Sequence, residues 1–126
     1  RQMCIRDRIV PHLAGVRKAG DPAVSRSIEM GRKAHKMLQD AMSAFAAEDE
    51  AAAKAVIDAD DAVDYDFNSI KRMLAAEIAA DPSKVDAALD VLMVIKYLER
   101  IGDHAVNIAE WVEFLRTGRY HHEKMF

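Results

Sequence analysis

Two Asp-Pro pairs, at 21–22 and 81–82, constrain the fold of this 126-residue chain more than any other feature. In each pair the aspartate can cap a helix, and the proline suits the first helical position because its missing N–H is not needed there. Both pairs therefore predict helix starts. Between them, the acidic run 48–50 suits the positive end of a helix, so a further start is expected near Asp49. Gly118 predicts the end of the last helix.

These signals predict three helices, at 22–47, 49–80 and 82–117. At about 1.5 Å per residue, the helices would be roughly 39, 48 and 54 Å long. Short connections make successive helices antiparallel. The composition agrees, since 51% of the residues are hydrophobic and the chain has only five Gly and three Pro. The sequence therefore predicts an all-α fold, an elongated antiparallel three-helix bundle.

The bundle is expected to occupy residues 21–118, because a chain of this length is about one domain. Residues 1–20 are basic and poorly patterned, and they begin without an initiating Met. We interpret them as a tail that is either non-native or the remnant of a preceding repeat. Residues 119–126 are interpreted as a C-terminal tail.

Bulk properties exclude several classes of protein. The net charge of −3 provides no basic footprint for nucleic acid. The apolar run 91–95 is far too short to cross a bilayer, and we find no secretory signal, so no membrane insertion is expected. The single cysteine, Cys4, suits a reducing compartment, which predicts a cytoplasmic protein.

Apolar residues at helical spacing predict the core. One stripe lies on the second helix and one on the third, and four Met residues are expected to fill the gaps. The predicted core residues are Val56, Val63, Phe67, Ile70, Leu74, Val94, Leu98, Ile101, Ala105, Ile108 and Val112, with Met37, Met42, Met73 and Met93.

The second and third helices carry the same row of oxygen-bearing side chains, two acids and then an asparagine, at steps of four residues. Residues at this spacing advance about 40° per step, so each row forms a single stripe. The stripe of the third helix, which includes Glu110, lies nearly opposite that helix's predicted apolar face and should look outward or into a groove. The rows are Asp60, Asp64 and Asn68, and Glu99, Asp103 and Asn107.

Clustered carboxylate and amide oxygens are the ligands that hard or borderline cations select. Residues 58–66 hold five aspartates, whose mutual repulsion a cation would relieve. An acidic helix face is usually just solvated, but the duplication of the row favours a metal site. Iron, zinc, magnesium, manganese and calcium all stay open.

Two runs of sequence resemble the PhoU family of phosphate-signalling regulators. They are LERIGDHAVNIAEWV at 98–112 and AFAAEDEAAAKAVIDADDAVD at 44–64, and the likeness covers about residues 25–122. PhoU proteins typically contain two three-helix repeats, and this chain resembles the second. The resemblance therefore implies a single PhoU-like repeat, and whether such a lone repeat forms a homodimer stays open.

The resemblance also implies a function. PhoU proteins are negative regulators of the phosphate regulon that act beside the ATPase of the phosphate ABC transporter and a membrane sensor histidine kinase. Their E/D-x-x-x-D motifs hold multinuclear iron or zinc clusters on the bundle surface in some members. The matching metal residues here are Asp60, Asp64 and Asn68, and Glu99, Asp103 and Asn107.

Two other classes are weighed against this one. Carboxylate-bridged di-iron enzymes use Glu-x-x-His pairs, which are missing here, as is a phosphate-binding loop, so we do not expect an enzyme. A metal-free helical adaptor, whose acidic stripe contacts a basic partner, is the remaining alternative.

Overall fold

The structure is a computed structural model that describes residues 21–117. Within this range the chain forms three α-helices and one short 3₁₀ turn, and no strand. The tails expected at 1–20 and 119–126, the residue Cys4 and the stop expected at Gly118 lie outside the described residues.

The first two helices begin at the aspartates that the sequence indicated. Helix α2 is Pro22–Ala47, and Asp21 Oδ1 accepts a hydrogen bond from the Ala23 backbone N–H at 2.8 Å. Helix α3 is Glu50–Ala80, and Asp49 Oδ1 accepts from the Ala52 N–H at 3.1 Å. These bonds satisfy backbone donors that have no partner inside the helix. The predicted span 22–47 is confirmed, and the predicted span 49–80 is correct except at Asp49, which caps α3 from outside the helix.

The last helix starts slightly later than expected. Residues Pro82–Lys84 form the 3₁₀ turn η1, and α4 follows as Val85–Thr117. The Lys84 N–H donates to the Asp81 carbonyl at 3.0 Å, which is the tighter i to i+3 pattern of a 3₁₀ turn. The helix start at the second Asp-Pro pair is thus correct, with a different first turn.

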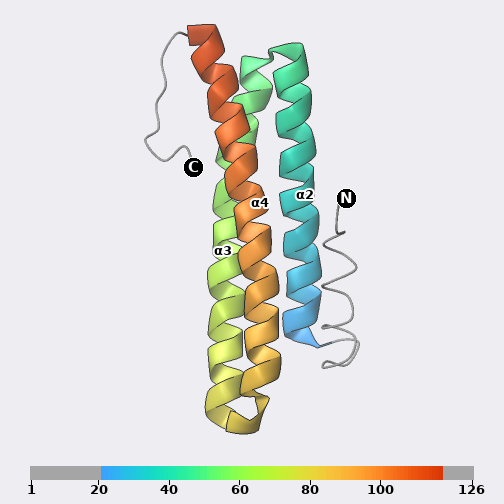
Figure 1. Cartoon of the computed structure of the whole chain (residues 1–126), viewed down its shortest axis with the longest axis vertical. Helices are drawn as coiled ribbons and strands as arrows, with labels where there is room; N and C mark the ends of the chain where they lie inside the picture. Colours follow the sequence, from blue (N-terminus) through green and yellow to red (C-terminus); the bar gives the residue numbers. More distant parts are fainter. Residues whose placement is uncertain (1–20, 118–126) are drawn as a thin grey trace, which may run out of the picture.

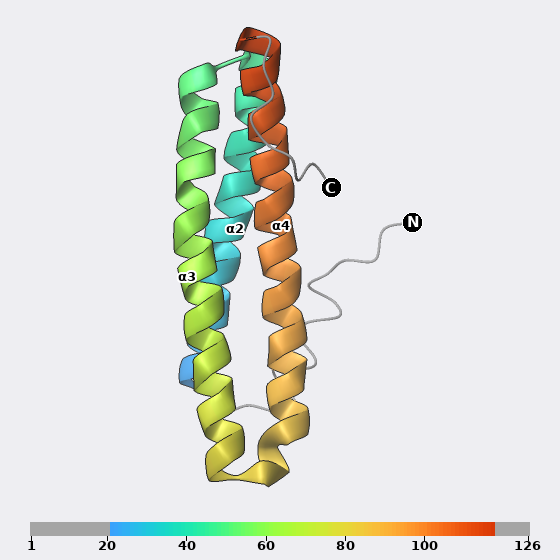
Figure 2. The same cartoon turned by 90° about the vertical axis from the view of Figure 1, so that its left-hand side faces the viewer.

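The helices lie side by side as one elongated rod (Figures 1 and 2). Helix α3 runs antiparallel to α2, and α4 turns back again, so that α2 and α4 point the same way. Each helix packs against both others. The fold is therefore the predicted all-α, elongated three-helix bundle.

The core runs along the axis of the rod and combines large aliphatic side chains with many alanines. The large, fully buried side chains include Met30, Ile70 and Ile95. Alanine positions let the helices approach closely. The buried alanines are Ala23, Ala34, Ala41, Ala44, Ala53, Ala88, Ala105 and Ala109.

The expectation that four Met residues fill the core is wrong for two of them. Met37 is buried and Met73 half-buried, but Met42 is 59% exposed and Met93 61% exposed. Met93 follows the buried Val91 by two residues, which is about 200° around the helix, so it must point outward. The same relation holds between Met42 and the buried Ala44.

Candidate functional site

Asp60, a member of the α3 row, lies close to the backbone of α4 at Gly102. A Cβ atom built at Gly102 would be 3.4 Å from Asp60 Oδ1 and 3.6 Å from Val63 Cγ1. The missing side chain at Gly102 therefore leaves room for the Asp60 carboxylate against α4. This contact fixes the level at which the two helices meet.

The contact sets the height of the two predicted rows relative to each other along α3 and α4. Asp103 follows Gly102 directly, so it lies at the level of Asp60. One turn along α3 leads from Asp60 to Asp64, and one turn back along the antiparallel α4 leads from Asp103 to Glu99. The four acidic residues thus lie at two successive levels along α3 and α4.

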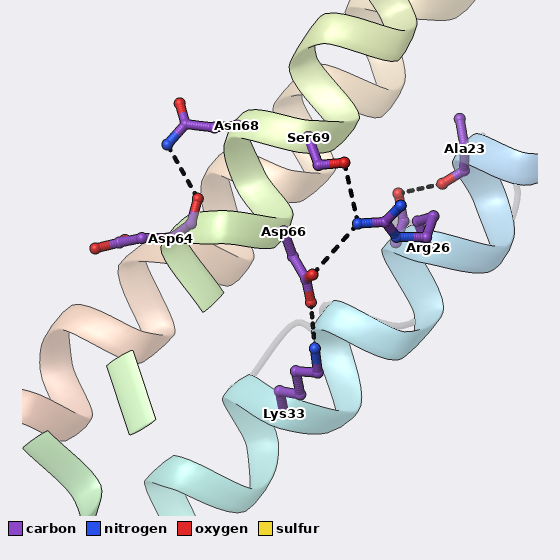
Figure 3. A network of polar contacts seen from close by, with 8 residues as sticks. Ala23, Arg26, Lys33, Asp64, Asp66, Asn68 and Ser69 are labelled. Carbon is purple, nitrogen blue, oxygen red and sulfur yellow. Dashed lines mark hydrogen bonds and ion pairs between the residues drawn. The ribbon is translucent and has the colours of Figure 1, made fainter. Parts of the chain in front are cut away.

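The two asparagines continue the rows in opposite directions. Asn68 is exposed, and its Nδ2 donates to the Asp64 backbone carbonyl at 3.1 Å (Figure 3). In that view Asp64 and Asn68 project from α3 on the side away from α2. Asn107 is half-buried on α4.

The α4 row was expected to look outward or into a groove, and Glu110 departs from that expectation because it is buried. Glu110 is only 5% exposed, while Glu99, Asp103 and Asn107 are half-buried. For Glu110 the prediction is wrong because it located the apolar face of α4 from large side chains such as Ile101, which is itself only half-buried. Small residues define much of the buried side instead, namely Ala88, Gly102, Ala105 and Ala109.

A lysine neutralises one acid of the α4 row. Lys96 Nζ donates to Glu99 Oε1 at 2.8 Å, one turn away on the same helix. The same ammonium lies 5.4 Å from the centroid of the Phe67 ring on α3, and Lys71 Nζ lies 5.8 Å from that centroid. Contacts of this kind are attractive cation–π interactions. The Phe67–Lys96 contact also agrees with the α3–α4 register deduced from Asp60.

The donor chemistry of the boundary suits a hard or borderline cation. Asp60 and Asp64 would supply carboxylate oxygens from α3, and Glu99 and Asp103 would supply them from α4. In their present conformations, no three His, Cys, Asp or Glu side chains among residues 21–117 come together as a metal-binding group. Binding would therefore require these side chains to turn toward a common point.

A polar network between α2 and α3 was not foreseen from the sequence (Figure 3). Asp66 is 4% exposed, and its Oδ2 accepts from Lys33 Nζ at 2.8 Å. Arg26 Nη2 lies 3.5 Å from Asp66 Oδ1 and donates to Ser69 Oγ at 3.0 Å. Asp66 thus faces α2 and not the α3–α4 boundary. The available signal was the spacing of Arg26 and Lys33, seven residues apart and so on one side of α2.

Helix α4 also carries exposed apolar side chains on one side, in two groups separated by the exposed Arg100 and His104, and we name the apolar residues the outer α4 face. Its five members are between 41% and 61% exposed. The ring of Trp111 stacks on Phe114 with centroids 5.0 Å apart. Exposed apolar side chains gathered on one side of a helix are typical of an interaction site. The outer α4 face consists of Leu89, Met93, Tyr97, Trp111 and Leu115.

The fold and these acidic rows define a class: a three-helix bundle with an oxygen-rich boundary between two long antiparallel helices. Comparison with known proteins identifies the family. The PhoU domain matches residues 28–112, from the first turns of α2 almost to the end of α4. The chain belongs to the PhoU domain family.

Curated relatives show the same relationship. The phosphate-specific transport system accessory protein PhoU homolog of Caulobacter vibrioides (strain NA1000 / CB15N) is 42% identical over 97 residues, or 76% of this chain and 42% of that protein. The homolog of Zymomonas mobilis is 37% identical over 90 residues, or 71% of this chain and 38% of its own length. That of Pseudomonas aeruginosa is 38% identical over 89 residues, or 71% and 37%.

The chain spans less than half the length of these relatives. A comparison with solved structures gave no match. In the described part of the chain, no helix combines the length and the apolar character needed to cross a bilayer.

Proposed function

We propose that this chain is a PhoU-type unit that regulates a phosphate-specific transport system and acts as a negative regulator of the phosphate regulon. The observation that carries the proposal is the match to the PhoU domain over residues 28–112, which extends through all three helices of the described bundle. The relatives' name, accessory protein of a phosphate-specific transport system, supports the same role. The role is one of binding and signalling in the cytoplasm, and not of catalysis.

The proposed partners are the ATPase of the phosphate ABC transporter and the sensor histidine kinase. The test is co-purification of the tagged chain with each of these proteins from cells grown in high phosphate. Retention of either protein supports the assignment. A second protein that joins two PhoU repeats in one chain is tested in the same way. If neither the ATPase nor the kinase binds that protein, the regulatory assignment is contradicted.

A second PhoU-type three-helix unit is the proposed occupant of the outer α4 face. From Leu89 to Leu115 these residues span about 39 Å along one helix, a length that fits another long helix lying alongside it, with the exposed Arg100 and His104 between the two apolar groups. The relatives' greater length is consistent with a further unit of this kind. For the present chain, the corresponding assembly is a homodimer.

Sedimentation velocity tests the homodimer. We expect the wild-type chain to be dimeric at micromolar concentration and the double variant Met93→Glu, Tyr97→Glu to be monomeric. Tyr65→Glu is the matched control, because Tyr65 is a 66% exposed aromatic residue on α3. A wild-type monomer, or equal effects of the two changes, contradicts this use of the outer α4 face.

The α3–α4 boundary is the proposed metal site, with Asp60, Asp64, Glu99 and Asp103 as the carboxylate donors. Iron or zinc is the expected ion, since some PhoU proteins hold clusters of these metals, and magnesium and manganese share the oxygen chemistry. Asn68 and Asn107 would add amide oxygens at the two ends of the rows.

Metal analysis of protein purified without chelator tests this site. Asp64→Ala and Asp103→Ala should each lower the metal content and leave the helical circular dichroism largely intact. Asp58→Ala is the control, because Asp58 is an exposed aspartate on the same helix. Unchanged stoichiometric metal in the Asp64/Asp103 double variant would place the ion elsewhere. Absence of metal from the wild type would favour the metal-free adaptor.

A further inference from the structure

The chain reverses between α2 and α3 without a residue that breaks helices. Residues 32–81 contain no Gly and no Pro, although the corner at residues 48 and 49 lies inside this stretch. On either side of the corner, residues 44–47 and 51–53 are mostly alanine, the strongest helix former. At the other corner, by contrast, Pro82 makes it unfavourable for α3 to continue as a helix. Local preference therefore favours one continuous helix through the α2–α3 corner.

Two residues alone turn the chain at this corner, and both depart from helical geometry. Glu48 is left-handed at φ 52° and ψ 43°, and Asp49 is extended at φ −96° and ψ 102°. Within residues 21–117, Glu48 is the one non-glycine residue with a positive φ. Glycine usually occupies this position after a helix, because a side chain destabilises the left-handed conformation. The corner is therefore strained at Glu48.

Helix α2 is held in the bundle by side-chain contacts that do not require it to belong to the same chain as its neighbours. Lys33 Nζ donates to Asp66 Oδ2 on α3 at 2.8 Å, and Arg26 Nη2 donates to Ser69 Oγ at 3.0 Å. The buried side of α2 packs against both α3 and α4. An α2 helix from a second copy can make all of these contacts.

We propose that α2 exchanges between two copies of this chain, giving a dimer in which each α2 packs against α3 and α4 of the other copy. In this dimer Glu48 and Asp49 are helical, and residues 22–80 form one helix about 88 Å long. The strain at Glu48 is then relieved, and each bundle keeps its core. Short, strained connections favour such an exchange. The exchange does not involve the outer α4 face or the proposed metal site.

The antiparallel packing of α2 and α3 suits this dimer (Figures 1 and 2). The two long helices lie antiparallel across a two-fold axis that passes near the former corner. The acidic run 48–50 of both copies meets there, and its repulsion, which salt screens, opposes the dimer. Within one chain, α2 is always close to its own α3, so exchange competes with closure only at high protein concentration.

The first experiment varies the corner in the full chain. Each protein also carries Met93→Glu and Tyr97→Glu, which remove association through the outer α4 face. The proteins are refolded from urea at about 1 mM, the order of the effective concentration within one chain, and sedimentation velocity follows dilution. The chain with Glu48 should contain dimer. Glu48→Gly should lower the dimer fraction at least about tenfold, because glycine suits the closed corner and weakens the open helix.

The matched control for the corner is Ala55→Gly. Ala55 is exposed and lies inside α3, so its substitution weakens a helix that is present in both the closed and the exchanged form. It should therefore leave the dimer fraction unchanged. An equal fall in Ala55→Gly and Glu48→Gly would mean that helix propensity in general, and not the corner, sets the dimer fraction.

The second experiment identifies the exchanged helix. Lys33→Glu in one chain and Asp66→Lys in another each bring like charges together while α2 stays in its own bundle. In a mixed exchanged dimer, one bundle regains the native Lys33–Asp66 pair and the other has the same pair with its charges reversed. In the Met93→Glu, Tyr97→Glu background, equimolar refolding should give at least about tenfold more dimer than either chain alone.

The control for this pairing uses Lys36→Glu and Asp40→Lys. Lys36 and Asp40 form an ion pair within α2, so they move together when the helix exchanges. Mixing these two chains should therefore give no additional dimer. An equal gain in the control mixture would mean that general charge attraction, and not exchange of α2, causes the association.

Each remaining outcome contradicts a defined part of the proposal. If the chain with Glu48 stays monomeric after refolding at high concentration, exchange does not occur. If it forms dimer but the Lys33 and Asp66 variants gain nothing when mixed, α2 is not the exchanged helix. Circular dichroism checks that the charge-reversed chains fold, and if they do not fold even when mixed, the corner variants decide alone. Regulation by a PhoU-type unit is unaffected by any of these results.

Discussion

Lys33 Nζ on α2 donates a hydrogen bond to Asp66 Oδ2 on α3 at 2.8 Å, and so joins the two helices through a carboxylate that is almost fully buried. Arg26 lies one heptad before Lys33 and reaches the other oxygen of the same carboxylate at 3.5 Å. Because both cations are partly exposed, each stays partly hydrated while it stabilises the buried charge. These contacts fix the register of α2 relative to α3 along the bundle axis.

Loss of the Lys33 ammonium should destabilise the bundle. Lys33→Met leaves Asp66 buried with Arg26 alone, and we expect the free energy of unfolding to fall by about 1–3 kcal/mol. The control is Lys36→Met, which breaks the exposed pair with Asp40 and should cost less than about 0.5 kcal/mol. Urea denaturation measures the free energy of unfolding of both variants. Equal losses would show that the Lys33–Asp66 bond stabilises the fold no more than an exposed ion pair does.

The buried Met37 and the exposed Met93 should respond differently to a polar substitution. Met37→Gln places an amide in the core, where Met37 is 3% exposed, and should cost about 1–3 kcal/mol. Met93→Gln changes a side chain that faces solvent and should stay within about 0.5 kcal/mol of wild type. Denaturant titrations of both, performed below the concentration at which the chain associates, check this. A large loss at Met93 would mean that this side chain is covered even in the monomer.

Gly31 offers a site for stabilisation. A Cβ built there would lie 3.7 Å from both terminal methyl carbons of Leu98, which is ordinary van der Waals contact. Gly31→Ala should therefore gain about 0.5–1 kcal/mol from helix propensity. Gly102→Ala is the comparison, and its gain should be smaller because the new methyl meets the Asp60 carboxylate at 3.4 Å. A loss of stability in Gly31→Ala would show that α2 and α4 pack more tightly there.

The turn before α4 predicts a pH effect. Hydrogen bonds from Ser83 Oγ at 2.7 Å and from the Ser83 N–H at 3.1 Å hold the pKa of Asp81 below its ordinary value of 3.8. Because the folded pKa is lowered, Asp81 stabilises the fold above its unfolded pKa, and this contribution disappears as pH falls through the folded value.

Ser83→Ala should raise the pKa of Asp81 toward 3.8, because it removes the hydroxyl donor that lowers it most. A carbon-13 NMR titration of the Asp81 carboxyl group measures the shift. Ser43→Ala, at an exposed position on α2, should leave that titration unchanged. An unaltered pKa of Asp81 in Ser83→Ala would rule out the hydroxyl as the cause.

The helices were predictable because their limits depend on local chemistry. Asp21 and Asp49 accept hydrogen bonds from backbone groups two or three residues away, so the sequence contains both partners. The Asp66–Lys33 bond joins residues 33 positions apart and depends on the rotation of α2 about its axis. The sequence around Asp66 does not reveal how α2 is rotated about its axis. It therefore does not distinguish Asp66 from the neighbouring aspartates.

In the candidate site, too, local spacing was predictable from the sequence and helix packing was not. The spacing of Asp60 and Asp64 predicted one stripe on α3, and the structure places Asp60 of that stripe against α4 at Gly102. The burial of Glu110 was not predictable in this way, because it depends on how closely α4 approaches its neighbours at Gly102 and the alanines. The metal itself stays a prediction.

The connection between α2 and α3 consists of Glu48 and Asp49 alone, and Glu48 reverses the chain with left-handed backbone angles of φ 52° and ψ 43°. So short a loop costs little entropy to close, so we expect these two helices to form a hairpin early in folding and α4 to dock onto it later. In stopped-flow experiments, Ile70→Ala should then slow refolding more than Val112→Ala, which should mainly accelerate unfolding. The reverse order would assign the folding nucleus to the α3–α4 pair.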